Sequence, residues 1–203
     1  FMNKILGNLN LQGLVCGFDF HFGYKGSGNV QFLQDNAPYE ICVVSAVEDE
    51  QGKISSTRIT KCIEQGHMEE ANRLLGSPFC MEGKVIHGKK RGTDMGFPTA
   101  NVQVSDEYII PKNGVYAGKI HVGRQSYGCM INIGLNPTFH DVDAISLEAN
   151  IFDFHEDIYG QVVSVDFLKF IRPEKQFRSK SNLVMQLEQD KRTIQKYFEE
   201  GVL

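Results

Sequence analysis

The chain has 203 residues, of which 41% are hydrophobic and 23% are charged, and its formal net charge at pH 7 is −4. This composition is ordinary for a globular protein, and the length allows one large domain or two small ones. The acidic balance disfavours nucleic acid as a partner. The sequence has no run of about 20 apolar residues that could span a membrane.

The five cysteines are scattered, odd in number and without a CxxC pair. Their spacing argues against both a disulfide framework and a zinc site. No basic segment followed by an apolar one opens the chain as a signal peptide would. We therefore expect a reducing, cytoplasmic environment.

Residues 1–78 have the pattern of a mixed α/β region. Leu14–Phe18 and Ile41–Val44 are short β-rich apolar runs, typical of buried parallel strands. Ser55 or Ser56 can cap a helix that carries Ile59 and Ile63 on one face.

That helix should end at Gly66, and a second one should run from about Met68 to Leu75. Gly76-Ser77-Pro78 then marks the expected boundary between two domains, 1–78 and 79–203.

From residue 79 onward the chain predicts an antiparallel sheet or barrel, because strand-like runs recur with turn signals between them. These runs cover residues 81–86, 114–122, 127–133, 145–152 and 162–170. In 145–151 the apolar side chains alternate with Ser146, Glu148 and Asn150, and in 162–167 Val163, Val165 and Phe167 alternate with polar ones. A helix from about residue 181 to 199, with an apolar stripe of Leu183, Leu187, Ile194 and Tyr197/Phe198, should pack on the barrel.

The segment Gly83–Asn101 suits a nucleotide polyphosphate. Its glycines, among them Gly88, let main-chain N–H groups converge on an anion, and Lys89–Arg91 add positive charge. After a proline the chain should be extended, so Thr99 and Asn101 share a face and offer two hard oxygen donors of the kind that Mg²⁺ accepts. The same residues would also fit a glycine-rich surface hairpin with a solvated basic tip.

Gly96–Asn101, which reads Gly-Phe-Pro-Thr-Ala-Asn, resembles the signature of riboflavin kinases. Further short motifs similar to that family follow in order: Asn113–Tyr116, Asn132–Gly134, Asn136–Phe139, Leu147–Ala149, Phe152–Phe154, Asp157–Gly160 and Arg172–Lys175. The resemblance covers the chain from about Phe79 to its C-terminus. It implies an α+β protein built on an antiparallel Greek-key β-barrel with a C-terminal helix, which phosphorylates riboflavin to FMN with MgATP and releases ADP.

Glu148 lies on the polar face of its expected strand, where it could accept a proton from an attacking hydroxyl. From the residues alone, a solvent-facing member of an amphipathic strand is the favoured interpretation. The resemblance implies that it is the catalytic base.

The resemblance also implies binding roles for residues on either side of Glu148. Gly88, Thr99 and Asn101 would contact the nucleotide phosphates, and Thr99 and Asn101 would also bind Mg²⁺. The adenosine side would be lined by Ile151, Asp153 and Tyr159. The flavin side would be formed by Arg172, Lys175 and Phe177. The chain departs from the family at Asn150, where histidine is frequent, and at Thr93-Asp94, where an acid replaces a basic or neutral residue.

The first 78 residues resemble the second half of a bacterial FMN adenylyltransferase domain, on the glycine-rich Gly17–Gly28 and on Ile54–Ile59. Ser55, Ser56, Thr57 and Arg58 would form a remnant of its ATP site at a helix N-terminus, although a serine-capped helix needs the same residues. The His-x-Gly-His motif of such enzymes is absent. We therefore expect that this chain alone does not adenylylate FMN, whereas a longer parent would make FAD. A non-catalytic flavin-binding sensor or carrier on the same barrel remains the alternative function.

Overall fold

The computed structural model describes residues 1–88, 92, 95–136 and 144–201. Contacts between residues divide the chain into two compact units, Phe1–Ser55 and Ser56–Leu203. Among the described residues, no helix is both long and apolar enough to cross a membrane. All five cysteines are free thiols.

The first unit contains a parallel pair of strands. Strand β1 (Gly13–Gly17) pairs with β4 (Glu40–Val44) in a register that sets Leu14 opposite Ile41. Helix α1 (Val30–Asn36) lies between them in the chain, and Asn29 caps it by accepting a hydrogen bond from Phe32 N. The smaller elements are η1 (Leu6–Asn8), β2 (His21–Phe22), η2 (Tyr24–Gly26), β3 (Gly28–Asn29), β5 (Glu48–Asp49) and β6 (Gly52–Lys53).

The prediction that these two strands are parallel is confirmed, but the prediction that they are buried is wrong. Val15 is 68% exposed and Val44 is 52% exposed. The described sheet has only these two strands. Because few elements cover it, its apolar side chains stay in contact with solvent.

Helices α2 (Ser56–Gln65) and α3 (Met68–Leu75) form where the sequence predicts them. Gly66, with a φ of 78°, ends the first, since the left-handed backbone region is readily open only to glycine. Their apolar side chains Ile63, Met68 and Ala71 belong to the same core cluster as the barrel.

Asn72 adds a polar link between α3 and the barrel. Its side chain donates to Phe167 O at 2.8 Å and accepts from Phe79 N at 2.8 Å. The contacts therefore group residues 56–78 with the barrel, whereas we expected a boundary after Pro78. The Gly-Ser-Pro sequence follows the end of α3, and a domain boundary after Pro78 stays a prediction.

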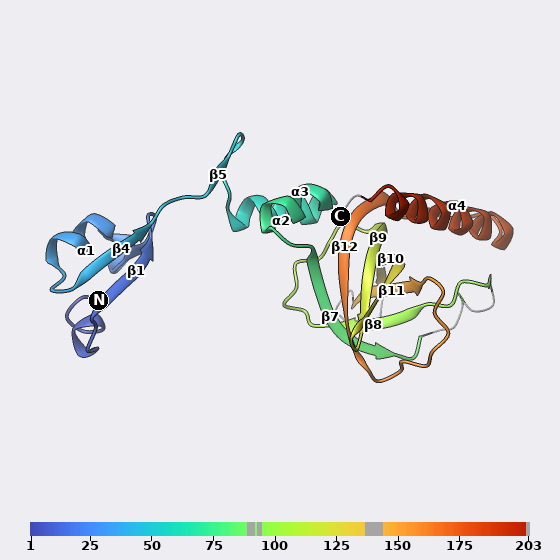
Figure 1. Cartoon of the computed structure of the whole chain (residues 1–203), viewed down its shortest axis with the longest axis horizontal. Coiled ribbons are helices and arrows are strands. Elements are labelled where there is room, and N and C mark those ends of the chain that lie inside the picture. Colours follow the sequence, from blue (N-terminus) through green and yellow to red (C-terminus); the bar gives the residue numbers. More distant parts are fainter. Residues whose placement is uncertain (89–91, 93–94, 137–143, 202–203) are drawn as a thin grey trace. The chain divides into compact units, whose positions relative to one another are not determined.

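The second unit is a closed antiparallel barrel with the strand order β10-β11-β8-β7-β12-β9 (Figure 1). Its strands are β7 (Phe79–Ile86), β8 (Ala100–Val104), β9 (Gly114–Val122), β10 (Gln125–Asn136), β11 (Ala144–Ile151) and β12 (Val162–Arg172). Strands β9, β10 and β11 follow one another, and β12 returns beside β9, which is the Greek-key arrangement. The expected fold class is thus confirmed. Strand β8 was expected only as an extended segment.

The alternation read from the sequence sets the barrel interior. Leu147 and Ala149 of β11, with Val163, Val165 and Phe167 of β12, are buried in one core cluster. The polar side chains between them face the outside of the barrel.

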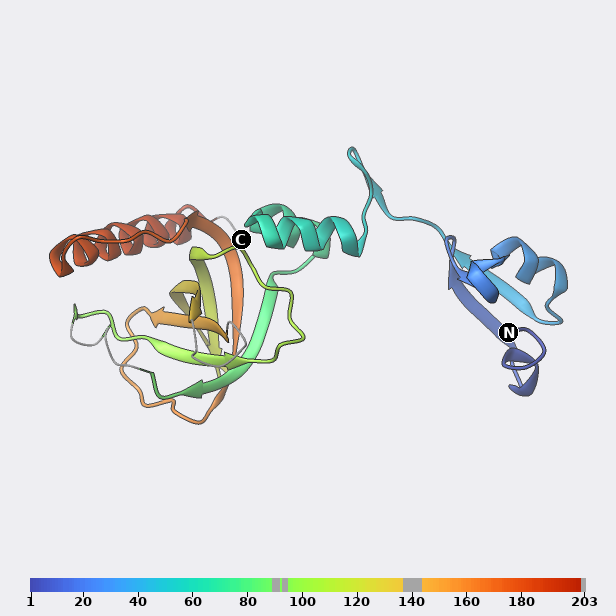
Figure 2. The same ribbon diagram turned by 180° about the vertical axis from the view of Figure 1, so that it is seen from behind.

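Part of that outer face is covered by helix α4 (Lys180–Glu199), which Figure 2 shows beside the barrel. Ser179 caps the helix by accepting a hydrogen bond from Asn182 N at 3.2 Å. Ile194 and Tyr197 pack in a second core cluster with barrel residues such as Leu168. The predicted helix and its packing on the barrel are confirmed, and the covered outer face becomes one wall of a cavity.

Candidate active site

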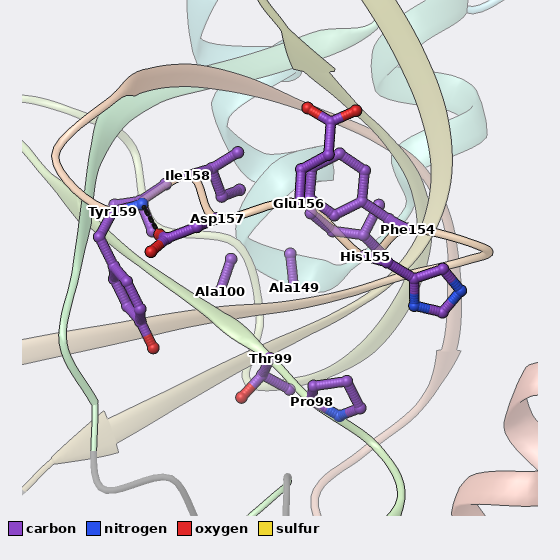
Figure 3. A pocket seen from close by; sticks show the side chains of 12 residues that line it. Pro98, Thr99, Ala100, Ala149, Phe154, His155, Glu156, Asp157, Ile158 and Tyr159 are labelled. Atoms are coloured by element: carbon purple, nitrogen blue, oxygen red, sulfur yellow. Dashed lines mark hydrogen bonds between the residues drawn. The ribbon is translucent and has the colours of Figure 1, made fainter.

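Two cavities of the barrel unit meet at Thr99. The first has a volume of about 430 Å³, and Figure 3 shows Pro98 and Thr99 on one side of it, Ala100 and Ala149 next, and Glu156 and Ile158 on the far side. It is lined by Val85, Pro98, Thr99, Ala100, Ala149, Ile151, Phe154, His155, Glu156, Asp157, Ile158 and Tyr159.

The second cavity, of about 500 Å³, lies between the outer face of the barrel, the segment after β12 and the start of α4. It is lined by Gly92, Met95, Phe97, Thr99, Val115, Met130, Asn132, Glu148, Asn150, Arg172, Glu174, Lys175, Phe177, Leu183 and Leu187. A ligand in either cavity would therefore contact the same threonine.

Thr99 and Glu148 are in direct contact. The Thr99 hydroxyl donates to one carboxylate oxygen of Glu148 at 3.3 Å, and the Ser146 hydroxyl donates to the other at 3.3 Å. The strand register explains the meeting, because Glu148 of β11 lies directly opposite Asn101 of β8 and Thr99 is two residues from Asn101. Thr99, Ser146 and Glu148 thus meet where the chain enters β8 beside β11.

Gly88 lies against the Asn101 side chain. A Cβ atom added at Gly88 would lie 2.2 Å from Asn101 Nδ2, far inside van der Waals contact. A larger residue at this position would displace the Asn101 side chain. The predicted basic residues Lys89–Arg91, together with Thr93-Asp94 and the segment 137–143, lie outside the described residues.

The donors at this site fit a magnesium ion that is held mainly by a substrate. A hydroxyl, an amide oxygen and a carboxylate, from Thr99, Asn101 and Glu148, are hard oxygen ligands of the type that Mg²⁺ binds beside phosphate oxygens. In the described part of the chain, no group of three or more His, Cys, Asp or Glu side chains is arranged to hold a metal by itself.

The first cavity contains two of the three residues expected on the adenosine side. Ile151 and Tyr159 line it, whereas Asp153 does not. Asp153 is exposed and has a φ of 53°, which places it at the turn after β11. The Asp157 carboxylate accepts a hydrogen bond from Tyr159 N at 3.0 Å (dashed in Figure 3), and the His87 ring lies 3.9 Å from the Tyr159 ring centroid. The Tyr159 backbone is thus held by Asp157, and its ring packs against His87.

The second cavity contains all three residues expected on the flavin side, Arg172, Lys175 and Phe177. Arg172 does not act there as a free cation. Its guanidinium donates to Asp190 Oδ2 through Nε at 2.9 Å and through Nη2 at 2.7 Å. Asp190 is only 2% exposed and belongs to α4, so this ion pair anchors the helix to the end of β12. The Arg172 guanidinium carbon also lies over the Phe177 ring, 5.9 Å from its centroid.

Several residues of the second cavity were not predicted as site residues. Asn132 lies opposite Glu148 in the sheet register, and Asn150 is 6% exposed, with its side-chain amide donating to Pro98 O at 2.7 Å. Leu183 and Leu187 of α4 close the cavity from outside. Asn132 belongs to the motif Asn132–Gly134 that carried the family resemblance, so the sequence could have indicated it as a site residue. Nothing in the local pattern indicates the burial of Asn150.

The predicted adenylyltransferase remnant lies at the start of helix α2. Ser55 belongs to the first compact unit, whereas Ser56, Thr57 and Arg58 begin α2 in the second. The Arg58 guanidinium pairs with Glu70 of α3 at 2.9 Å. Arg73 and Arg58 hold the pKa of the Glu70 carboxyl below its ordinary value. The described contacts of Arg58 thus include a role in joining the two helices.

The fold and the site together define a class of protein: a closed antiparallel barrel in which a threonine and a glutamate separate two ligand-sized cavities. A family model described as riboflavin kinase matches residues 75–198, and a second, described as FAD synthetase, matches residues 1–58. Because the first match covers more than half of the sequence, the chain belongs to the riboflavin kinase family.

Named relatives agree with this assignment. A bifunctional riboflavin kinase/FMN adenylyltransferase of Listeria monocytogenes is 42% identical over 98% of this chain and 64% of its own length. The protein of the same name from Bacillus subtilis is 39% identical over 98% of this chain and 64% of its own length. The chain thus spans about two thirds of the length of these relatives. A solved structure from Streptococcus pneumoniae, described as a macrolide-efflux protein, superposes with a TM-score of 0.86 at 40% identity and covers 94% of this chain and 62% of its own.

Proposed function

We propose that this chain is a riboflavin kinase, which transfers the γ-phosphoryl group of ATP to the 5′-hydroxyl of riboflavin and yields FMN and ADP. The observation that carries the proposal is the 3.3 Å contact between Thr99 and Glu148 at the wall shared by the two cavities. Phosphoryl transfer to an alcohol needs a nucleotide clamp, an acceptor site beside it and a group that orients or deprotonates the hydroxyl. The two cavities and the contact between them match these needs.

In this proposal ATP occupies the first cavity. Tyr159 and Ile151, which line it, would lie beside the adenosine. Gly88, Thr99 and Asn101 would lie beside the phosphates, and Gly88, which packs directly on the Asn101 side chain, would offer its main-chain N–H group. When bound, Mg²⁺ would neutralise charge on the phosphate oxygens, and Thr99 and Asn101 would supply its protein ligands.

Riboflavin occupies the second cavity. Phe177 offers an aromatic face to the flat isoalloxazine ring, and the exposed Lys175 is a cation for its carbonyl groups. Arg172 shapes the wall through its pair with Asp190, whose charge compensates its own. The ribityl chain would then reach Glu148, beside Thr99.

Glu148 would accept the proton of the 5′-hydroxyl as the oxygen attacks. A bond forms between that oxygen and the γ-phosphorus, the bond from the γ-phosphorus to the β–γ bridging oxygen breaks, and ADP leaves with the electron pair. The hydroxyls of Thr99 and Ser146, one on each carboxylate oxygen, hold the base in place. A base fixed on two barrel strands is positioned more firmly than one on a loop.

The test is to incubate the protein with riboflavin and MgATP and to separate the flavins by chromatography. We expect time-dependent FMN and an equal amount of ADP, both abolished when EDTA removes the metal. Riboflavin that binds without conversion would instead indicate a flavin sensor or carrier. Absence of both binding and product would refute the assignment of the second cavity.

We further propose that a longer protein containing this chain also converts FMN to FAD. The FAD synthetase match at residues 1–58 and the names of the relatives support this second activity. The chain as it stands should form no FAD from FMN and MgATP, because its sequence lacks the His-x-Gly-His motif. FAD above background in the same chromatographic assay would contradict that expectation.

A further inference from the structure

The backbone hydrogen bonds between β8 and β11 end before Asn150, and the Asn150 side chain makes the next hydrogen bond between the two segments. The last paired residues are Ala100 and Ala149, and Pro98 has no N–H with which to extend the ladder. Asn150 Nδ2 instead donates to the Pro98 carbonyl at 2.7 Å, a distance typical of a good hydrogen bond. The segment that enters β8 is therefore attached to β11 by a side chain at this point.

This attachment lies one residue from Thr99 on one strand and two residues from Glu148 on the other. The hydrogen bond between Thr99 and Glu148 is 3.3 Å long, which is longer than the roughly 2.5–3.0 Å usual for O–H···O bonds. A small displacement of the Pro98 carbonyl would move the adjacent Thr99 and break its hydrogen bond to Glu148. Asn150 is 6% exposed, so its amide is protected from water that could compete for the same carbonyl.

We propose that Asn150 is a positioning residue for phosphoryl transfer: it holds Pro98 so that the Thr99 hydroxyl stays between the two cavities, on Glu148. This inference rests on the proposed function, and it adds a residue that acts through Thr99 and not through contact with flavin. The donor that Asn150 provides is committed to Pro98, although Asn150 also lines the second cavity.

Asn72 provides a matched control. Its side chain also donates to a backbone carbonyl, that of Phe167, at 2.8 Å, and it lies at the junction of α3 and the barrel, outside both cavities. Asn72→Ala removes two hydrogen bonds to the backbone, so it should lower the thermal midpoint at least as much as Asn150→Ala does. A purely structural role for Asn150 would make the two variants alike in kinetics.

The experiment compares Asn150→Ala, Asn150→His and Asn72→Ala for kcat, for the KM of riboflavin and for the affinity of MgADP measured by calorimetry. Asn150→Ala should lower kcat roughly tenfold and weaken MgADP by roughly three- to tenfold, the scale of one lost hydrogen bond, with the KM of riboflavin unchanged. Asn150→His should restore much of the loss, because imidazole Nδ1 can donate from the position of the amide nitrogen. Asn72→Ala should leave all three kinetic and binding values unchanged.

A double-mutant cycle with Thr99→Ala separates indirect from direct action. If Asn150 acts through Thr99, adding Asn150→Ala to Thr99→Ala should cause little further loss. A tenfold loss in both backgrounds, a raised KM for riboflavin, or a wild-type MgADP affinity in Asn150→Ala would each overturn the proposal. If the wild-type protein forms no FMN, the proposed function fails, and the MgADP affinities alone then decide whether Asn150 positions the nucleotide side.

Discussion

Replacing Glu148 by glutamine tests the chemical step at the centre of the proposed mechanism. The side chain keeps its size, but it can no longer accept a proton, so turnover should fall by roughly two to four orders of magnitude. That loss corresponds to about 2.7 to 5.4 kcal/mol of transition-state stabilisation.

The same substitution should barely affect folding. Glu148 accepts two hydrogen bonds, from Thr99 and Ser146, and both are 3.3 Å long. Glutamine retains one accepting oxygen, so at most one of these bonds is lost, at a cost of about 1 kcal/mol or less. The kinetic effect therefore exceeds the structural one by a wide margin.

Glu82→Gln is the matched control. Glu82 lies on strand β7 of the same barrel, is exposed, and lines neither cavity. Initial rates of FMN formation at saturating riboflavin and MgATP give kcat for both variants, and urea denaturation gives their stabilities. A Glu148→Gln variant within threefold of wild-type kcat would refute the general-base role, as would an equal loss of rate in Glu82→Gln.

Three further substitutions test other parts of the structure. Gly88→Ala should raise the KM for MgATP by roughly 10- to 100-fold without changing the KM for riboflavin. The reason is that the alanine Cβ would lie 2.2 Å from Asn101 Nδ2 and displace that side chain. Initial-rate kinetics equal to those of the wild type would contradict this prediction. Asp190→Ala should lower the unfolding free energy in urea by about 3–5 kcal/mol, because it leaves the buried Arg172 guanidinium without its partner; a loss below about 1 kcal/mol would show that the pair behaves as a surface ion pair. Burial raises the pKa of the Cys80 thiol from 9.0 to about 11, so the stability that the protonated thiol contributes is complete below pH 9 and is lost as the pH rises to about 11. Cys80→Ser should reduce this alkaline decline in the urea midpoint, and an unchanged decline would contradict the prediction.

Much of the barrel was predictable from local pattern. Alternating side chains such as Val163 and Val165 indicated strands with one buried face, and turn residues separated the runs. Strand β8 was harder to recognise, since it is only five residues long and follows a glycine-rich segment. The grouping of residues 56–78 with the barrel depends on where Ile63 and Met68 pack, which is tertiary information that a Gly-Ser-Pro turn does not contain.

The pairing of Thr99 with Glu148 was predictable because extended-strand geometry and the family resemblance led to the same two residues. The partner of Arg172 was not, because Asp190 is 18 residues further on and reaches it only through the docking of α4. The burial of Asn150 could not be predicted from local pattern for the same reason. Alternation along β11 places it on the polar face, and only the cover supplied by other segments makes that face an interior wall.

The position of Thr99 on both cavities has a consequence for inhibitor chemistry. A bisubstrate molecule, with a purine at one end and a tricyclic ring at the other, would need only a short tether to pass this side chain. Once one end is seated, the other is delivered at a high effective concentration, so the combined affinity would exceed that of either fragment. The distance from one cavity to the other past Thr99 sets the best tether length.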